Sequence, residues 1–249
     1  GTTDYVCFIN WGNLPWGAFF PPEVTRPLIE KSGQLDIRIL ADNNLSVDEN
    51  ILYSGIARSN AQDYILMNAY PMPGPRKCRR VLDFGAGLGR QANLWTQLED
   101  DGLVYVAVDA IPKCYCTQHF YYSNIDKPYH DYVLEDNNIS LTTKARGIYH
   151  IPTWRMDLLP DEYFDKIAAT QVLPEISPLL VEHAVKQFKR ILKPSGQLYI
   201  RDHKLKWTPV HQMDVDAYLE EKGFVKEFEL YVEDKVELHG IPRIFRKRK

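Results

Sequence analysis

A short apolar segment at residues 81–84 leads into a turn with glycines at positions 85, 87 and 89, and an apolar helical segment follows. Glycine adopts backbone conformations that other residues avoid, and it lets the main chain pass close to a ligand. The N–H groups at the start of the following helix have no partner within that helix and can bind a ligand. This order of strand, glycine turn and helix predicts an α/β domain with a ligand site at the end of its first strand.

Apolar segments with strand-like and helix-like spacing alternate from residue 80 to the end of the sequence. Strands are predicted at residues 104–108, 148–154, 166–170 and 197–200, and a hairpin pair at 224–232 and 241–246. Helices are predicted at about residues 92–98, 112–124, 181–192 and 215–222. This alternation indicates a doubly wound α/β fold with a mainly parallel sheet and helices on both faces.

Residues 1–75 are rich in aromatic residues and proline and lack the alternation seen later. We interpret them as an N-terminal helical cap or lid, and residues 76–249 as the ligand-binding domain. Within the cap, apolar residues at helical intervals predict a helix between Ser46 and Tyr70. The prolines at residues 71–75 end that helix and make a natural hinge into the main domain.

The composition excludes several classes of protein. The sequence has 249 residues, of which 45% are hydrophobic and 25% charged, as in an ordinary globular protein. A net charge of −3 does not attract polyanions, so we expect no nucleic-acid partner. No apolar run approaches the roughly 20 residues of a membrane-spanning helix, so we expect no membrane association. Four unevenly spaced cysteines give neither a disulfide framework nor a four-ligand zinc site, which predicts a cytoplasmic protein.

Asp109 stands twenty residues after Gly89, at the end of the second predicted strand. A carboxylate in that position can accept hydrogen bonds from both hydroxyl groups of a ribose. The glycine turn and Asp109 together predict a ligand that contains adenosine.

The details of the turn favour S-adenosylmethionine over NAD(P). In a dinucleotide fingerprint, G-x-G-x-x-G, the third glycine would stand where Arg90 is, whereas here it comes one residue early at Gly89. Asp83 also precedes the glycines, and its carboxylate is unfavourable beside a pyrophosphate but favourable beside an ammonium and a sulfonium. Two alternatives remain: an NAD(P)-linked oxidoreductase and a non-catalytic module that only binds.

From about residue 53 to residue 249, the sequence resembles the class I S-adenosylmethionine-dependent methyltransferases. The D-x-G-x-G-x-G turn at residues 83–89 is similar to their first motif, and Asp109 to their ribose-binding acid. Residues 164–170 resemble their fourth strand, and residues 190–197 resemble the "LKPGG" turn before their fifth. The resemblance implies a Rossmann-like seven-stranded sheet in the order 3-2-1-4-5-7-6, with strand 7 antiparallel.

The resemblance also implies a cofactor site. The segment from Met156 to Leu158 is similar to the one after strand three, where an acidic side chain takes the adenine amino group. Tyr53 lies on the predicted cap helix, where its side chain could touch the cofactor's carboxylate or the acceptor. The predicted cofactor-binding residues are Asp83, Gly85, Ala86, Gly87, Gly89, Asp109, Ala110, Met156, Asp157, Leu158, Thr170, Gln171 and Tyr53.

Three segments, at residues 108–112, 119–123 and 170–176, are similar to sugar O-methyltransferases. This narrower likeness implies that the methyl acceptor is a hydroxyl of a sugar or another small natural product. Methyl transfer from a sulfonium is an in-line displacement, so a hydroxyl acceptor needs a nearby base. Strands four and five end beside the methyl group in this fold, which nominates Gln171, Glu175, Asp202 and His203. We expect His203 to be the base, because imidazole titrates near neutrality, with Glu175 as the alternative.

Two absences narrow the reaction further. Nucleic-acid amine methyltransferases of this class carry an Asn- or Asp-Pro-Pro-aromatic run after strand four, whereas residues 170–174 read TQVLP. Metal-dependent O-methyltransferases need a carboxylate at the same place, and neither Thr170 nor Gln171 supplies one. We therefore expect neither a nucleic-acid amine substrate nor a bound metal.

Overall fold

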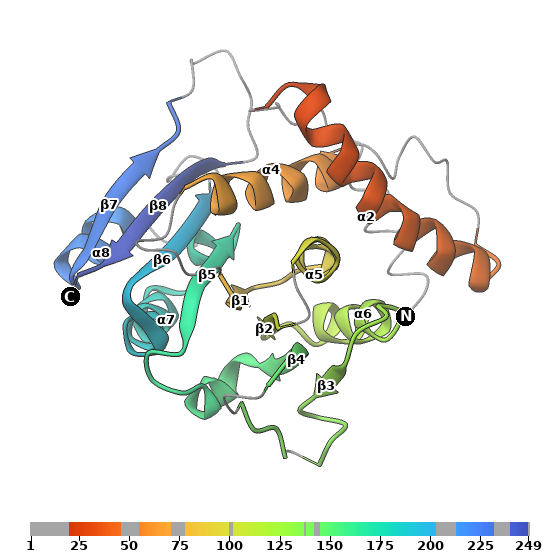
Figure 1. Ribbon diagram of the computed structural model, residues 1–249. Helices are drawn as coiled ribbons and strands as arrows, with labels where there is room; N and C mark the ends of the chain where they lie inside the picture. The colour runs from red at the N-terminus through yellow and green to blue at the C-terminus, as the bar shows by residue number, and fades with distance from the viewer. Residues whose placement is uncertain are drawn as a thin grey trace.

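The computed structural model describes residues 20–45, 55–70, 78–99, 102–136, 138–141, 145–202, 213–231 and 240–248. Within these residues the strands form one eight-stranded sheet (Figure 1). The strands are β1 (Arg80–Phe84), β2 (Val104–Asp109), β3 (Tyr129–Asp131), β4 (Gly147–Pro152), β5 (Phe164–Thr170), β6 (Leu192–Asp202), β7 (Phe224–Glu229) and β8 (Ile241–Lys247). The helices are α2 (Pro22–Asp42), α4 (Gly55–Ala69), α5 (Arg90–Leu98), α6 (Pro112–Tyr122), α7 (Pro178–Ile191) and α8 (Val215–Glu221), with 3₁₀ helices η2 (Thr153–Leu158) and η3 (Leu173–Glu175).

The strand order is β3-β4-β2-β1-β5-β6-β8-β7, and only β8 runs antiparallel to its neighbours, β6 and β7. Without β3, this is the predicted order 3-2-1-4-5-7-6 with an antiparallel seventh strand. The eighth strand, β3, was not predicted. It has three residues and pairs in parallel with β4 at the edge of the sheet, and so short a strand leaves no periodic signal in the sequence.

The two faces of the sheet carry separate cores because neighbouring side chains on a strand point to opposite faces. On β2, Val106 and Val108 pack in a core with α7 and α8. Tyr105 and Ala107, between and beside them, pack in a second core with α2, α4, α5 and α6. Figure 1 shows these four helices on one side of the sheet and α7 on the other. The predicted doubly wound α/β fold is therefore confirmed.

The N-terminal region holds a helix that the sequence did not predict. Helix α2 spans 21 residues, includes Pro27, and buries the polar side chains of Thr25, Ser32 and Asp36. Polar residues on its buried face interrupt the apolar stripe by which a helix is usually recognised. Helix α4 lies within the helix predicted between Ser46 and Tyr70, whereas residues 46–54 and the predicted hinge at 71–75 lie outside the described residues.

Buried ion pairs join α2 and α4 to the sheet domain. Asp36 of α2 pairs with Arg90 of α5, and both side chains are buried. Asp63 of α4 accepts a 2.7 Å hydrogen bond from Arg201 Nε of β6 and a 2.6 Å bond from the Tyr199 hydroxyl. These contacts fix α4 against one face of the sheet and α2 against α5.

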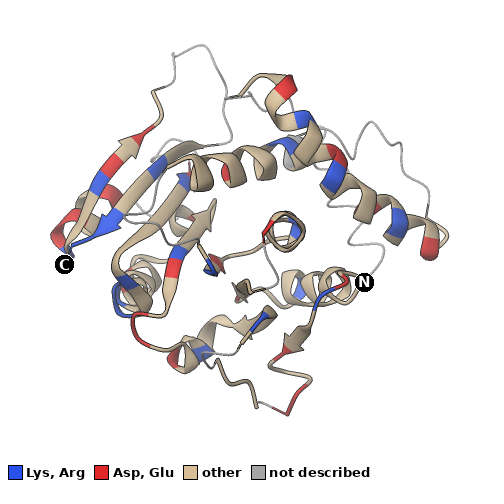
Figure 2. Cartoon of the chain, in the orientation of Figure 1, with Lys and Arg blue, Asp and Glu red and all other residues tan. Residues whose placement is uncertain are grey.

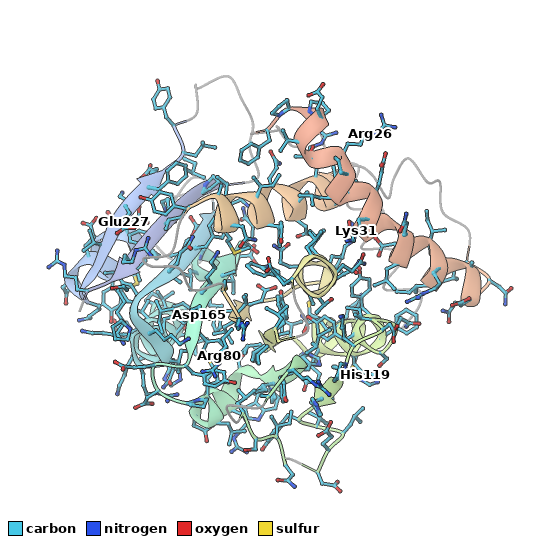
Figure 3. All side chains as sticks on the ribbon, in the orientation of Figure 1. Arg26, Lys31, Arg80, His119, Asp165 and Glu227 are labelled. Atoms are coloured by element: carbon cyan, nitrogen blue, oxygen red, sulfur yellow. The ribbon has the colours of Figure 1, made fainter. Side chains whose placement is uncertain are left out.

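The outer side of α2 is charged and exposed. Figure 2 shows acidic and basic residues interspersed along this helix. Arg26 and Glu30 form a 2.7 Å ion pair with side chains 77% and 50% exposed, whereas the Lys31 ammonium donates to the carbonyl of Gln97 on α5 (Figure 3). Among the helices that the structure describes, none is long and apolar enough to cross a membrane.

Candidate functional site

The carboxyl ends of the parallel strands meet at one edge of the sheet. In the strand register, Phe84 at the end of β1 lies between Val108 and Ala169. Asp109 pairs with Pro152 of β4 in the same way. Open α/β sheets bind ligands outside this edge. Described residues that were predicted to bind the cofactor lie at or just beyond these strand ends.

The three glycines of the turn have positive φ angles of 73°, 56° and 78° at Gly85, Gly87 and Gly89. A Cβ added to Gly85 would lie 2.7 Å from Val172, and one added to Gly89 would lie 2.5 Å from Tyr122. These two glycines therefore allow close packing inside the protein. A Cβ at Gly87 would meet nothing within 4 Å, so the turn faces open space at this position. The predicted residue Ala86, half-buried, lies in the same turn.

The Asp83 carboxyl is buried at the end of β1. Burial raises the pKa of this carboxyl to about 7, although the Tyr105 hydroxyl donates a 2.6 Å hydrogen bond that favours the charged form. The negative charges of Asp63 and Asp109 raise the pKa further. Asp83 therefore changes charge near neutral pH, and a cationic ligand would favour its ionised form.

The Asp109 carboxylate is held by three donors. Oδ1 accepts from the Ile111 N–H at 3.0 Å, and Oδ2 accepts from the Gly87 N–H at 3.3 Å and from Gln118 Nε2 at 2.8 Å. The carboxylate thus bridges the glycine turn and the start of α6. Ala110, the next predicted residue, is exposed.

Two exposed apolar side chains near Asp109 were not predicted to belong to the site. Ile111 is 56% exposed and stands two residues beyond Asp109, and Trp154 is 69% exposed and stands two residues beyond Pro152. Because Asp109 and Pro152 are paired across β2 and β4, both side chains follow adjacent strand ends. Exposed apolar side chains of this kind suit an adenine ring. The sequence gives no exposure, so it does not distinguish them from core residues.

The predicted adenine segment lies on η2. The Met156 side chain is buried in the core, and its carbonyl accepts a 2.9 Å hydrogen bond from Arg190. Leu158 is half-buried, whereas Asp157 is exposed. Arg155 donates a 3.0 Å hydrogen bond to Asp157 and lowers the pKa of its carboxyl. Of the three predicted residues, only Asp157 presents a polar side chain to solvent.

The end of β5 provides Thr170, Gln171 and, two residues further on, η3 with Glu175. Gln171 has a positive φ of 54°, and its N–H donates to the carbonyl of Arg201 at 2.8 Å. Glu175 is exposed, yet partial desolvation raises the pKa of its carboxyl. Burial raises the pKa of the Cys114 thiol, on α6, to about 11, and the nearby charges of Asp109 and Glu175 add to this shift. Glu175 and Asp109 therefore both lie near the same thiol.

The end of β6 provides Asp202, which is buried and accepts a 2.7 Å hydrogen bond from Arg243 of β8. Because the Asp202 carboxylate is paired with Arg243 inside the sheet, its role is structural and it is not a candidate for the base. His203 and Tyr53, both predicted site residues, lie outside the described residues. Among the side chains that the structure describes, no group of three His, Cys, Asp or Glu residues is arranged to hold a metal ion.

Comparisons with known proteins agree with this geometry. Residues 55–231 match a family model described as a methyltransferase domain. The fold is similar to that of the PH0226 protein from Pyrococcus horikoshii OT3, with 17% identity, a TM-score of 0.51, and 77% of this chain and 91% of that chain covered. It is also similar to the CurJ carbon methyltransferase, with 13% identity, a TM-score of 0.52, and 100% of this chain and 71% of that chain covered. A search of curated proteins finds no match. The family match covers well over half of the sequence, so the chain belongs to the methyltransferase-domain family and is a class I S-adenosylmethionine-dependent methyltransferase.

Proposed function

We propose that this enzyme transfers a methyl group to a hydroxyl of a small molecule, a sugar or another natural product. S-adenosylmethionine supplies a methyl group bound to a positively charged sulfur. The observation that carries the proposal is the position of Glu175, a carboxyl with a raised pKa that shares the neighbourhood of Cys114 with Asp109. The likeness of residues 108–112, 119–123 and 170–176 to sugar O-methyltransferases supports the same acceptor class.

The residues at the strand ends fit this cofactor. The open space at Gly87 leaves room for a ligand against the turn. In our proposal, the Asp109 carboxylate accepts from a ribose hydroxyl, and Asp157 accepts from the adenine amino group. Asp83 faces the ammonium of the methionine part, whose positive charge favours the ionised carboxylate.

A hydroxyl acceptor must lose its proton as the new carbon–oxygen bond forms. In our proposal this proton passes to Glu175 or to His203. Desolvation raises the pKa of Glu175 and makes its carboxylate a stronger base at neutral pH. His203 follows Asp202 directly, at the end of the next strand. In the sequence, each of the two residues therefore follows a parallel strand, β5 or β6, whose carboxyl end lies at the proposed site.

The base is identified by comparing Glu175→Gln with His203→Asn. We expect the variant that lacks the base to lose about 10²–10⁴-fold in kcat and to bind S-adenosylmethionine as the wild type does. Glu182→Gln changes an exposed glutamate of α7 and serves as the control. The measurement is transfer of an isotopically labelled methyl group to a panel of sugars and hydroxylated natural products. Label found on nitrogen or carbon, or full kcat in both variants, contradicts the proposal.

The raised pKa of Asp83 predicts a pH-dependent affinity for the cofactor. Below pH 7 the free protein carries a proton on Asp83, and a bound ammonium must displace it. Affinity for S-adenosylmethionine should therefore rise by about tenfold between pH 6 and pH 8, with proton release at the lower pH. Titration calorimetry in buffers of different ionisation enthalpy measures both quantities. Subtracting the profile of Asp83→Asn removes the contribution of the ligand's own amino group, and an unchanged slope in that variant would refute the assignment.

A further inference from the structure

A row of buried polar side chains lies behind Asp109. Gln118 Nε2 donates to Asp109 Oδ2 and to the carbonyl of Gly87, both at 2.8 Å. On its other side, Gln118 Oε1 lies 2.8 Å from Nε2 of His150, and Nδ1 of His150 lies 3.2 Å from Asp131 Oδ2. Gln118 and His150 are fully buried, and Asp131 is almost so. The row connects the glycine turn and Asp109 to the far edge of the sheet at β3.

The partners of Gln118 determine its orientation. Its amide nitrogen faces a carbonyl and a carboxylate, which are both acceptors, so turning the amide over would bring oxygen against oxygen. The amide oxygen must therefore face His150, and Nε2 of His150 must carry a hydrogen. Nδ1 faces the Asp131 carboxylate and, at 3.2 Å, the Tyr129 hydroxyl. Burial lowers the pKa of His150, whereas Asp131 favours the protonated ring, in which Nδ1 donates to the carboxylate while Nε2 donates to Gln118.

The surrounding groups hold His150 and Asp131 in place. The Tyr115 ring stacks on His150 with centroids 3.6 Å apart, and its hydroxyl donates to Asp131. The Tyr129 hydroxyl donates to Asp131 at 2.7 Å, and His119 of α6, labelled in Figure 3, lies 3.3 Å from the same carboxylate. Burial opposes ionisation, but the hydrogen bonds from His150 and Tyr129 hold the pKa of Asp131 well below its usual range.

A buried polar row of this kind is seldom the most stable way to fill a core, because apolar side chains of similar volume often do as well or better. The row holds the Gln118 side-chain amide in one orientation. Asp109 Oδ2 accepts hydrogen bonds from Gln118 and from the Gly87 N–H. Among the described residues, Oδ1 accepts only from the Ile111 N–H. A carboxylate offers about four acceptor positions, so Oδ1 has room for a ribose hydroxyl.

We propose that Gln118 and His150 are positioning residues for the cofactor's ribose: His150, held by Asp131, orients Gln118, and Gln118 aims Oδ1 of Asp109 at a ribose hydroxyl. This inference rests on the proposed role of Asp109 as the ribose-binding acid. In metal sites, a carboxylate orients a histidine ligand through a hydrogen bond in a comparable way.

The test is discrimination between S-adenosylhomocysteine and its 2′-deoxyribose analogue, measured by titration calorimetry on the same protein sample. A hydrogen bond to a charged carboxylate corresponds to a preference of about tenfold or more for the ribose ligand in the wild type. We expect Gln118→Leu and His150→Leu to reduce this preference to less than about threefold, as Asp109→Asn does. His150→Gln keeps an N–H donor close to the position of Nε2, and we expect it to restore most of the preference.

The ratio of two affinities separates positioning from folding. A destabilised variant loses the same factor for both ligands, because both need the same folded state. Gln197→Leu provides the control: Gln197 is a fully buried glutamine of β6, paired with Lys166 of β5 away from the strand ends. If Gln118→Leu keeps the wild-type preference for the ribose ligand while Asp109→Asn loses it, the inference about Gln118 is wrong but the ribose role of Asp109 stands. No preference in the wild type, or an unchanged preference in Asp109→Asn, would overturn the ribose role of Asp109 as well.

Discussion

Asp109→Ala is expected to reduce the affinity for S-adenosylmethionine and S-adenosylhomocysteine by about 10- to 100-fold, the amount that corresponds to one hydrogen bond to a charged group. The carboxylate is buried, accepts hydrogen bonds from the glycine turn and from the start of α6, and has an acceptor position left on Oδ1. The variant leaves Gln118 and two N–H groups without this acceptor, so the turn should also lose its fixed position. Titration calorimetry measures the affinities of both ligands.

The matched control is Asp126→Ala. Asp126 is an exposed aspartate that follows α6. It lines a surface hollow with Leu103 and Gly147, which lie at the amino ends of β2 and β4, away from the proposed site. Its removal should change neither affinity. NAD should bind to neither the wild type nor the variants, because the family match favours methyl transfer over the NAD(P)-linked alternative. Equal affinities for S-adenosylmethionine in Asp109→Ala and the wild type would show that another residue holds the ribose.

Most of the sheet could be predicted from the sequence because each strand and helix of the main domain carries a local pattern. The stripe of Val181, Val185 and Phe188 is fully buried on α7, as its spacing predicts. Helix α2 escaped prediction because Thr25, Ser32 and Asp36 lie on its buried face. Arg90 of α5 pairs with Asp36, and Asn93 of α5 donates to the Ser32 carbonyl, so the partners on this buried face come from a distant part of the sequence.

The site divides in the same way. The glycine turn and Asp109 could be predicted because backbone geometry and strand position determine their residue types. Gln118 and His150 could not, because a buried glutamine on a helix has the same local pattern as an exposed one. Their role depends on packing between α6, β3 and β4, which brings residues together over separations of 19 and 32 positions. The bases proposed from the sequence, His203 and Glu175, stay predictions.

The largest expected effect on stability is that of Asp63→Ala. Asp63 accepts hydrogen bonds from Arg201 Nε at 2.7 Å, from Arg201 Nη2 at 2.9 Å and from the Tyr199 hydroxyl at 2.6 Å, and all three residues are buried. Removing the carboxylate takes from a buried guanidinium the acceptor of its Nε and Nη2 hydrogen bonds, which costs about 3–5 kcal/mol of the free energy of unfolding. Glu30→Ala breaks the exposed pair with Arg26 on α2 and should cost less than about 0.5 kcal/mol.

Urea unfolding followed by circular dichroism measures both free energies, and the double variant Asp63→Leu/Arg201→Met tests the cause. Replacing both charges with apolar side chains should recover much of the loss, because neither charge of this pair then remains in the core.

The same data address the predicted domain boundary near residue 75. A single transition that moves as a whole in Asp63→Ala would place α4 in the cooperative core of the methyltransferase domain. A loss below about 1 kcal/mol, with the main transition unmoved, would instead make α4 part of a separate cap, because a helix outside the core can be released without unfolding the sheet.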